Sequence, residues 1–145
     1  MWTFINPVYP HLGASPDGLV FDPQQSDPNG TLEIKCPASD SWKNQSPSEC
    51  ARDPNFFCRF DPATNAVTLK RDHPYYCQVQ GQLAITGRQW CDFVVWTLKQ
   101  PLSVEKIYYD QHFWGKMLSN LNKFYIQGVL PELFTTRVQR GISLY

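Results

Sequence analysis

The pattern of hydrophobic and polar positions along the chain predicts a series of short strands before its first long helix. Residues 12–21 and 31–36 predict two strands of a hairpin, and the polar segment 22–30 predicts the loop between them. Residues 56–60 and 67–71 flank the turn sequence Asp-Pro-Ala-Thr-Asn and predict a second hairpin. Residues 37–55 are rich in Pro, Ser, Asn and Asp without a sustained period, which predicts a long loop or an insertion.

A helix is predicted over residues 74–87, because Pro74 suits a first helical turn and Gly87 suits a helix end. Helical spacing forms two adjoining faces, a polar one with Tyr75, Gln78 and Gln82 and an apolar one with Tyr76, Val79 and Leu83. The polar face suits hydrogen bonds to a water or a phosphate. It equally suits plain exposure to solvent, and the helix alone leaves both interpretations open.

The last third of the chain predicts two more strands and a long helix. Residues 90–98 are apolar on both faces, which is typical of a buried central strand, and residues 102–109 predict a strand that borders the sheet. Residues 111–127 predict an amphipathic helix packed against the sheet, ended by Gly128, and Pro131 begins a short final turn or helix. This order predicts one α/β domain over residues 1–145, with a mixed central sheet flanked by helices.

Composition narrows the class of protein. The chain has 145 residues, 42% of them hydrophobic, and a formal net charge of zero, which argues against a basic coat that binds DNA at any point. No stretch reaches the ~20 apolar residues of a membrane span. Five cysteines without a C-x-x-C pair predict reduced thiols in an intracellular protein. A zinc site from Cys50, Cys58 and His73 is an alternative with irregular ligand spacing.

The candidate chemistry lies in Asp17, Glu33 and Lys35. Strand alternation places Glu33 and Lys35 on one face and predicts that Leu32, Ile34 and Cys36 face a core. Two carboxylates and a lysine can hold a divalent metal such as Mg²⁺ beside a phosphodiester and offset the charge of its hydrolysis. The alternatives are an ordinary Pro-Asp-Gly turn and a solvated strand face.

For other polar and aromatic residues, the sequence gives weaker evidence of a functional role. Lys70, Arg71 and His73 form a small basic cluster before the predicted helix, which suits either phosphate contact or a solvated strand end. Trp42 lies in the polar loop and is a candidate for stacking on a base. The three other tryptophans considered are predicted to be core residues: Trp90, Trp96 and Trp114.

Three motifs in this order resemble a known family. Ser15-Pro16-Asp17-Gly18, then Leu32-Glu33-Ile34-Lys35-Cys36-Pro37, then Tyr75-x-x-Gln78-Val79-Gln80 are similar to the motifs of the YqaJ viral recombinase domain. That family contains the phage lambda-type exonucleases of the PD-(D/E)XK nuclease superfamily, which have a restriction-endonuclease-like fold. The resemblance covers roughly residues 8–133. Residues 81–96 also resemble the eukaryotic branch associated with mobile elements.

The resemblance implies roles for individual residues. Asp17 and Glu33 match the metal-binding carboxylates, and Ile34 matches the residue whose backbone carbonyl completes the metal coordination. The metal implied is Mg²⁺ or Mn²⁺, with two ions in the site. Lys35 matches the catalytic lysine and Gln78 the active-site glutamine. Four further residues are candidates for binding the substrate: Tyr75, Ser15, Lys70 and Arg71.

The resemblance also implies an activity and partners. Family members digest linear double-stranded DNA from a 5′ end, in recombination or repair. The resemblance therefore implies three kinds of partner: DNA, a single-strand annealing protein and further copies of the chain in a homo-oligomer. In a eukaryote, it also implies a nuclear location. A helix normally precedes the aspartate-bearing strand, and residues 1–7 are too short to supply it, so we expect this chain to lack that helix. The alternative functions are a noncatalytic DNA-binding or interaction module and a structural domain in which Glu33 and Lys35 only form an ion pair.

Overall fold

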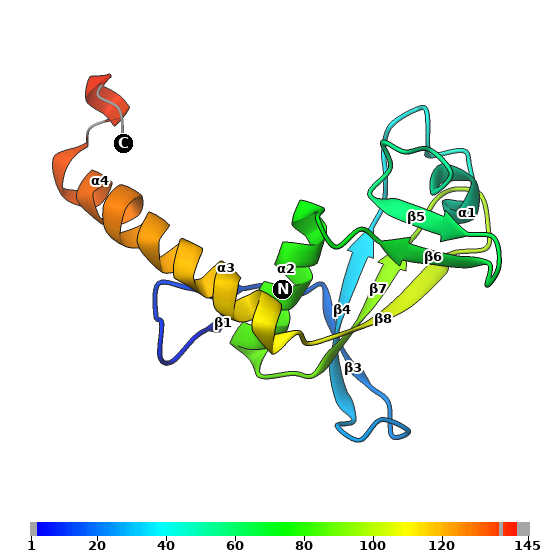
Figure 1. The fold of residues 1–145 in the computed structure, drawn as a ribbon, viewed down its shortest axis with the longest axis horizontal. Coiled ribbons are helices and arrows are strands. Elements are labelled where there is room, and N and C mark those ends of the chain that lie inside the picture. Colours follow the sequence, from blue (N-terminus) through cyan, green and yellow to red (C-terminus); the bar gives the residue numbers. More distant parts are fainter. Residues whose placement is uncertain (1–2, 137, 142–145) are drawn as a thin grey trace. The chain divides into compact units, whose positions relative to one another are not determined.

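The structure, a computed structural model, describes residues 3–136 and 138–141 (Figure 1). Its internal contacts divide the chain into two compact units, Met1–Tyr109 and Asp110–Tyr145, and each is described by itself. The interpretation of residues 1–145 as one domain stays a prediction.

A four-stranded mixed sheet forms the centre of the first unit, in the order β3-β4-β7-β8. Its strands are β3 (Gly18–Phe21), β4 (Asn29–Lys35), β7 (Trp90–Val95) and β8 (Ser103–Tyr108). β4 pairs antiparallel with β3 and parallel with β7, and β7 pairs antiparallel with β8. A parallel neighbour requires a long crossover connection, and the crossover from β4 to β7 contains a hairpin and two helices. The predicted mixed α/β sheet is therefore confirmed.

The strand predicted over residues 12–21 is interrupted. Its first part is β2 (Gly13–Ala14), which pairs with β1 (Phe4–Ile5) in a separate two-stranded sheet, whereas its second part is β3. Pro16 lies between the two parts and cannot donate to a strand ladder. The prediction of one continuous strand was wrong at this point, and the interruption leaves Asp17 in the bend that enters β3.

The crossover contains the elements that cover the sheet. The predicted second hairpin is confirmed as β5 (Cys58–Asp61) and β6 (Ala66–Leu69). The predicted helix is confirmed as α2 (Pro74–Thr86), and Gly87 ends it in the left-handed conformation, with φ of 69°. The interpretation of residues 37–55 as a loop missed one helical turn, α1 (Pro47–Cys50), whose capping box joins Ser46 and Glu49.

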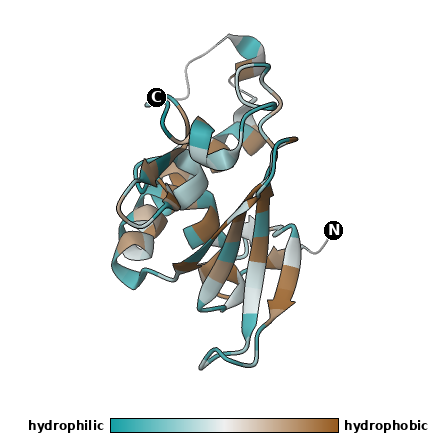
Figure 2. Ribbon diagram, turned by 90° about the vertical axis from the view of Figure 1, so that its right-hand side faces the viewer, coloured by the Kyte–Doolittle hydropathy of each residue, from teal (hydrophilic) through white to brown (hydrophobic). Residues whose placement is uncertain are grey.

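The face of β4 that carries Glu33 is the buried one. Glu33 is only 2% exposed, whereas Ile34 is 39% exposed and Cys36 is also exposed. The prediction that Leu32, Ile34 and Cys36 face a core was therefore wrong. Alternation alone does not tell which face is covered, and here α2 packs on the Glu33 face and supplies amides that bind the carboxylate. Figure 2 shows apolar segments along the strands and a hydrophilic loop between β3 and β4.

Trp90 holds the β3–β4 hairpin against β7. Its side chain is 1% exposed, and its indole N–H donates to the backbone carbonyl of Asp27 at 2.7 Å. Lys106 lies over the ring, with Nζ 3.5 Å from the ring centroid. Trp96, by contrast, is 39% exposed, so its prediction as a core residue was wrong.

We expect Gly30→Ala to destabilise the first unit by about 1–3 kcal/mol, as overpacked sites do. A Cβ at Gly30 would lie 2.4 Å from two ring carbons of Trp90, and the ring cannot retreat without losing its hydrogen bond. Chemical denaturation followed by circular dichroism measures the change. Gly115→Ala is the control, because a Cβ there meets nothing within 4 Å and alanine favours a helix. Equal stability of the Gly30 variant and the wild type would contradict this packing.

The second unit is helical through most of its described part. α3 (Gln111–Phe124) continues through a π-helical turn (Tyr125–Val129) into α4 (Leu130–Thr135), and a 3₁₀ turn follows at Val138–Arg140. The prediction that Gly128 ends the helix was wrong, because Gly128 lies inside the π-helical turn and the chain stays helical beyond it. Trp114 is 8% exposed, as predicted for a buried residue. Within the described ranges, no helix is long and apolar enough to span a membrane.

Candidate active site

Glu33 is the centre of the candidate site. Its Oε1 accepts hydrogen bonds from Lys35 Nζ at 2.5 Å and from Gln78 Nε2 at 2.7 Å, and its Oε2 accepts one from Gln82 Nε2 at 2.8 Å. The Glu33 side chain is 3% exposed, so its charge depends on these three donors. They use three of the roughly four acceptor positions of a carboxylate.

Lys35 lies beside Glu33 on the same face of β4, as strand alternation predicted. Its Nζ donates to Gln78 Oε1 at 3.0 Å in addition to Glu33, and lies 4.2 Å from the centroid of the Tyr75 ring. Lys35 is 16% exposed. The cation is therefore fixed by an acid, an amide and an aromatic face, and it still reaches solvent.

Helix α2 delivers the polar partners of this network. Gln78 and Gln82 are one helical turn apart, so both reach β4 from the same face of the helix. The alternative that these amides face solvent was wrong for Gln82, which is 3% exposed, whereas Gln78 is exposed and also contacts Glu33. The sequence placed Gln82 on this face without a role, and its spacing of four residues from Gln78 is the signal that points to it. Gln82 Oε1 is buried and has no hydrogen-bond partner among the described residues.

Asp17 lies just before β3 and contacts β4 at the edge that pairs with β3. Its Oδ2 accepts a hydrogen bond from the backbone N–H of Ile34 at 2.8 Å. Backbone N–H and C=O groups of successive residues point to opposite edges of a strand, and the Lys35 carbonyl accepts a hydrogen bond from Trp96 N, just after β7. The carbonyl of Ile34 therefore points to the edge where Asp17 lies.

The donor set fits a hard divalent cation. The carboxylates of Asp17 and Glu33 and the carbonyl of Ile34 are oxygen donors, which Mg²⁺ and Mn²⁺ prefer, and Mg²⁺ commonly takes only one or two carboxylates and keeps several waters. Across residues 3–136 and 138–141, no cluster of three or more His, Cys, Asp or Glu side chains occurs. The alternative zinc site from Cys50, Cys58 and His73 is thus contradicted, and all five cysteines are free.

The other predicted substrate-binding residues each have their own contacts. Tyr75 contacts Lys35 directly, as described above. Ser15 is exposed and lies in hydrogen-bond reach of Thr3, with 3.3 Å between the hydroxyl oxygens. Lys70 donates to the carbonyl of Pro54 at 2.5 Å, and the Arg71 guanidinium lies 5.5 Å from the centroid of the Tyr76 ring. Lys70 and Arg71 therefore contact other protein groups, and their role toward a substrate stays a prediction.

The β5–β6 hairpin, which Lys70 and Arg71 directly follow, is fixed to the sheet by Glu105 of β8. Its carboxylate accepts a hydrogen bond from the backbone N–H of Leu69 at 2.6 Å. Burial raises the pKa of Glu105, whereas the Leu69 hydrogen bond opposes this rise. Sequence reasoning missed this anchor, because it joins residues 36 positions apart.

His73 starts α2 and is uncharged in that role. Its Nδ1 accepts a hydrogen bond from the backbone N–H of Tyr75 at 3.2 Å, which requires an unprotonated nitrogen. Burial lowers the pKa of His73 below its usual 6.5, and the nearby Lys70 and Lys35 lower it further against an opposing effect of Asp72. Protonation therefore removes the cap of the helix that carries Gln78 and Gln82.

A pH dependence of stability follows for His73. Its folded-state pKa is lowered, so its contribution to the free energy of unfolding is complete above an unfolded-state pKa of about 6.5 and is lost as the pH falls through the folded-state pKa. We expect His73→Asn, which keeps a capping side chain without titration, to flatten this decline. Urea unfolding between pH 5 and 8, roughly the range in which histidine titrates, measures it. Parallel pH profiles of variant and wild type would contradict the assignment.

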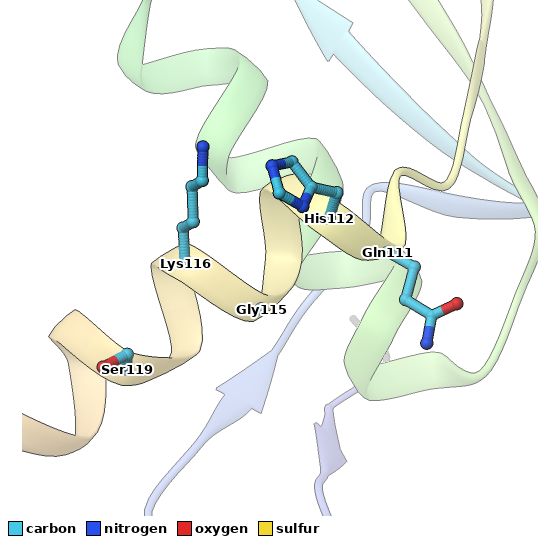
Figure 3. Close-up of a pocket in the computed structure, with 5 residues that line it drawn as sticks. All are labelled: Gln111, His112, Gly115, Lys116 and Ser119. Atoms are coloured by element: carbon cyan, nitrogen blue, oxygen red, sulfur yellow. The ribbon is translucent and has the colours of Figure 1, made fainter.

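A second group of polar side chains lies on α3 and differs in chemistry. Figure 3 shows an open pocket lined by Gln111, His112, Gly115, Lys116 and Ser119, all from this one helix. Among these lining residues none is acidic, so the pocket does not offer the carboxylates of the Glu33 network. The candidate chemistry stays with Asp17, Glu33, Lys35 and Gln78.

Comparisons with known proteins show the family and the fold of the chain. The family model of the YqaJ-like viral recombinase domain matches residues 2–89. The crystal structure of LHK-Exo in complex with dAMP is similar with a TM-score of 0.52 and 22% identity, over 88% of this chain and 62% of that chain. The crystal structure of an alkaline exonuclease (LHK-Exo) from Laribacter hongkongensis has a TM-score of 0.47 and 23% identity, over 77% of this chain and 55% of that chain. No curated protein matches the chain.

The first of these likenesses shows the fold, which is the predicted restriction-endonuclease-like PD-(D/E)XK fold. The chain spans about 62% of the length of that structure. The part of the chain matched by the family includes Asp17, Glu33, Lys35 and Gln78.

Proposed function

The chain belongs to the YqaJ-like viral recombinase family, and from this premise we propose that it is a metal-dependent DNA nuclease. The substrate is linear double-stranded DNA, degraded from a 5′ end in recombination or repair. The observation that carries the proposal is the convergence of Glu33, Lys35 and Gln78 in one hydrogen-bonded network, beside the bond from Ile34 to Asp17.

The residues divide into those that hold a metal and those that face the reacting phosphate. Asp17, Glu33 and the carbonyl of Ile34 would hold Mg²⁺ or Mn²⁺. When bound, such ions lower the pKa of a coordinated water and neutralise charge on the phosphate. Gln82 orients Glu33 through the bond to Oε2, because the carboxylate is otherwise buried without a partner on that oxygen.

Lys35 and Gln78 both donate to the other carboxylate oxygen of Glu33, Oε1. The Lys35 ammonium offsets the negative charge that develops on the phosphate, which is the largest electrostatic requirement of this reaction. Gln78 offers both an amide N–H and an oxygen, and its contacts with Glu33 and Lys35 fix it where it can position the attacking water. Tyr75 stabilises the Lys35 cation through its ring face, whose centroid lies 4.2 Å from Nζ.

The test is a time course of nucleotide release from end-labelled linear duplex DNA. We expect release with Mg²⁺ or Mn²⁺, none with a chelator, and none from a closed circular duplex. DNA binding without release at any metal concentration would contradict the nuclease and favour the noncatalytic binding module. The absence of both would favour the structural ion pair.

Gln82→Leu is expected to raise the metal concentration for half-maximal release by about 10- to 100-fold, because it removes a group that orients a metal ligand. Gln80→Leu is the matched control. Gln80 is also a buried glutamine of α2, but its side-chain amide nitrogen donates to the backbone carbonyl of Tyr108. The metal requirement is measured by titrating Mn²⁺ in the nuclease assay. Equal shifts of the half-maximal Mn²⁺ concentration in both variants would show that Gln82 contributes only to packing.

A further inference from the structure

An aromatic cavity of about 310 Å³ opens beside Lys35. Its walls include Cys36 just after β4, Trp42 in the segment that follows, Phe57 before β5, and Tyr75 at the start of α2. Lys35 and Tyr75 belong both to this cavity and to the Glu33 network. A ligand in the cavity therefore lies next to the proposed position of the scissile phosphate.

The aromatic walls are held in place before any ligand arrives. The Trp42 indole N–H donates to Asp53 Oδ2 at 3.3 Å, and its ring meets Phe56 at 5.2 Å in an edge contact. The Tyr75 ring meets Phe57 in the same manner at 5.1 Å. Phe57 is 7% exposed, which makes it a fixed wall, whereas Trp42 and Tyr75 are partly exposed. A preformed site loses little conformational entropy on binding.

The lining also restricts the chemistry of the ligand. Lys35 is the one charged residue among those that line the cavity, and it lies at the end shared with the Glu33 network. The remaining walls are aromatic or apolar, apart from Ser39 and the Cys36 thiol. A ligand with a flat π-system and an anionic end matches this arrangement, and a nucleotide has both. The volume lies at the lower end of the range for small-molecule sites.

We propose that this cavity binds the nucleobase of the nucleotide whose phosphate lies at Lys35, with Trp42 and Tyr75 as stacking surfaces. The proposal rests on the proposed nuclease function and adds a base-binding subsite to it. Stacking accepts every base, because every base has a π-face. The subsite therefore serves a nuclease without sequence preference.

Cys36 makes occupancy measurable in the unmodified protein. It is the exposed cysteine and lines the cavity, whereas Cys58 and Cys91 are buried and burial raises the pKa of each thiol to about 12. We expect dAMP to slow alkylation of Cys36 by iodoacetamide, followed by mass spectrometry. Deoxyribose 5-phosphate, which lacks the base, is expected to protect far less. Cys77 lies outside the lining residues and is the internal control.

Variants of Trp42 test the stacking surface. We expect Trp42→Ala to weaken protection of Cys36 by dAMP about tenfold or more, and Trp42→Phe to restore most of it. Trp96→Ala is the control, because Trp96 is also partly exposed but does not line the cavity. Circular dichroism of each variant separates lost binding from lost folding, and the comparison of dAMP with deoxyribose 5-phosphate needs no variant.

The outcomes distinguish this proposal from the nuclease itself. Equal protection by dAMP and deoxyribose 5-phosphate overturns the base subsite and reduces it to a phosphate contact. Active DNA degradation without protection by dAMP also overturns the subsite, while the nuclease stands. Base-dependent protection in a protein without nuclease activity supports the subsite and overturns the proposed function.

Discussion

Lys35→Ala is expected to reduce metal-dependent nucleotide release by about 10²- to 10⁴-fold, the range for losing a group that acts on the transition state. Lys35 is fixed by Glu33, Gln78 and the Tyr75 ring. It is the one cation among the described side chains of this network, so no other member can replace its charge. Initial rates on end-labelled linear duplex with saturating Mn²⁺ measure the loss. Lys43→Ala is the control, because Lys43 pairs with the exposed Asp40 instead of Glu33.

The same substitution also affects folding, and the two effects must be separated. Removing Lys35 leaves a 3% exposed carboxylate with only its two glutamine donors, which costs about 1–3 kcal/mol. A double variant, Lys35→Met with Glu33→Gln, removes both charges and is expected to recover stability without recovering activity. Activity in that double variant would contradict the proposed roles of both Lys35 and Glu33.

The helix and hairpins were predictable because their signals are local. Pro74 and Gly87 mark the two ends of α2, and the apolar spacing between them specifies the helical period. The turn sequence between β5 and β6 likewise identifies a hairpin, with Asn65 at φ of 56°. Each of these features depends on residues within about one element.

The orientation of β4 was not predictable by the same reasoning. Alternation correctly grouped Glu33 with Lys35, but hydrophobicity assigned the core to Ile34 on the opposite face. The outcome depends on Gln78 and Gln82, which lie more than 40 residues further along the chain and satisfy the buried carboxylate. A charged residue can occupy a buried face when its partners arrive from another element, and a single-strand pattern does not contain those partners.

Gly128 shows the opposite limitation, a local signal that the structure overrides. Glycine is a common helix end because it accepts positive φ, yet here the backbone widens into a π-helical turn and continues. Pro131 then follows in the first turn of α4, and its ring nitrogen has no hydrogen to donate to the π-helical turn before it. Glycine permits a helix to end without requiring it.

Asp17→Asn is expected to abolish detectable metal-dependent nucleotide release while leaving the fold intact. The proposed metal site has only two carboxylates, so neutralising one removes about half of its anionic charge. The asparagine oxygen can still accept the hydrogen bond from Ile34 N, and Asp17 is exposed, so the change has little effect on packing. The effect on activity is easier to separate from an effect on stability for Asp17 than for Lys35, because Asp17 is not part of a buried ion pair.

Two measurements test Asp17 together. Calorimetric titration with Mn²⁺ is expected to show a large loss of affinity, and thermal unfolding without metal is expected to match the wild type. Asp61→Asn is the control, since Asp61 is also exposed and also accepts a backbone hydrogen bond, from Ala63 N at 2.9 Å, in the turn between β5 and β6. Unchanged Mn²⁺ affinity in Asp17→Asn would remove Asp17 from the metal site. Release would then have to depend on Glu33 and the Ile34 carbonyl alone, a donor set with a single charge that binds a divalent ion weakly.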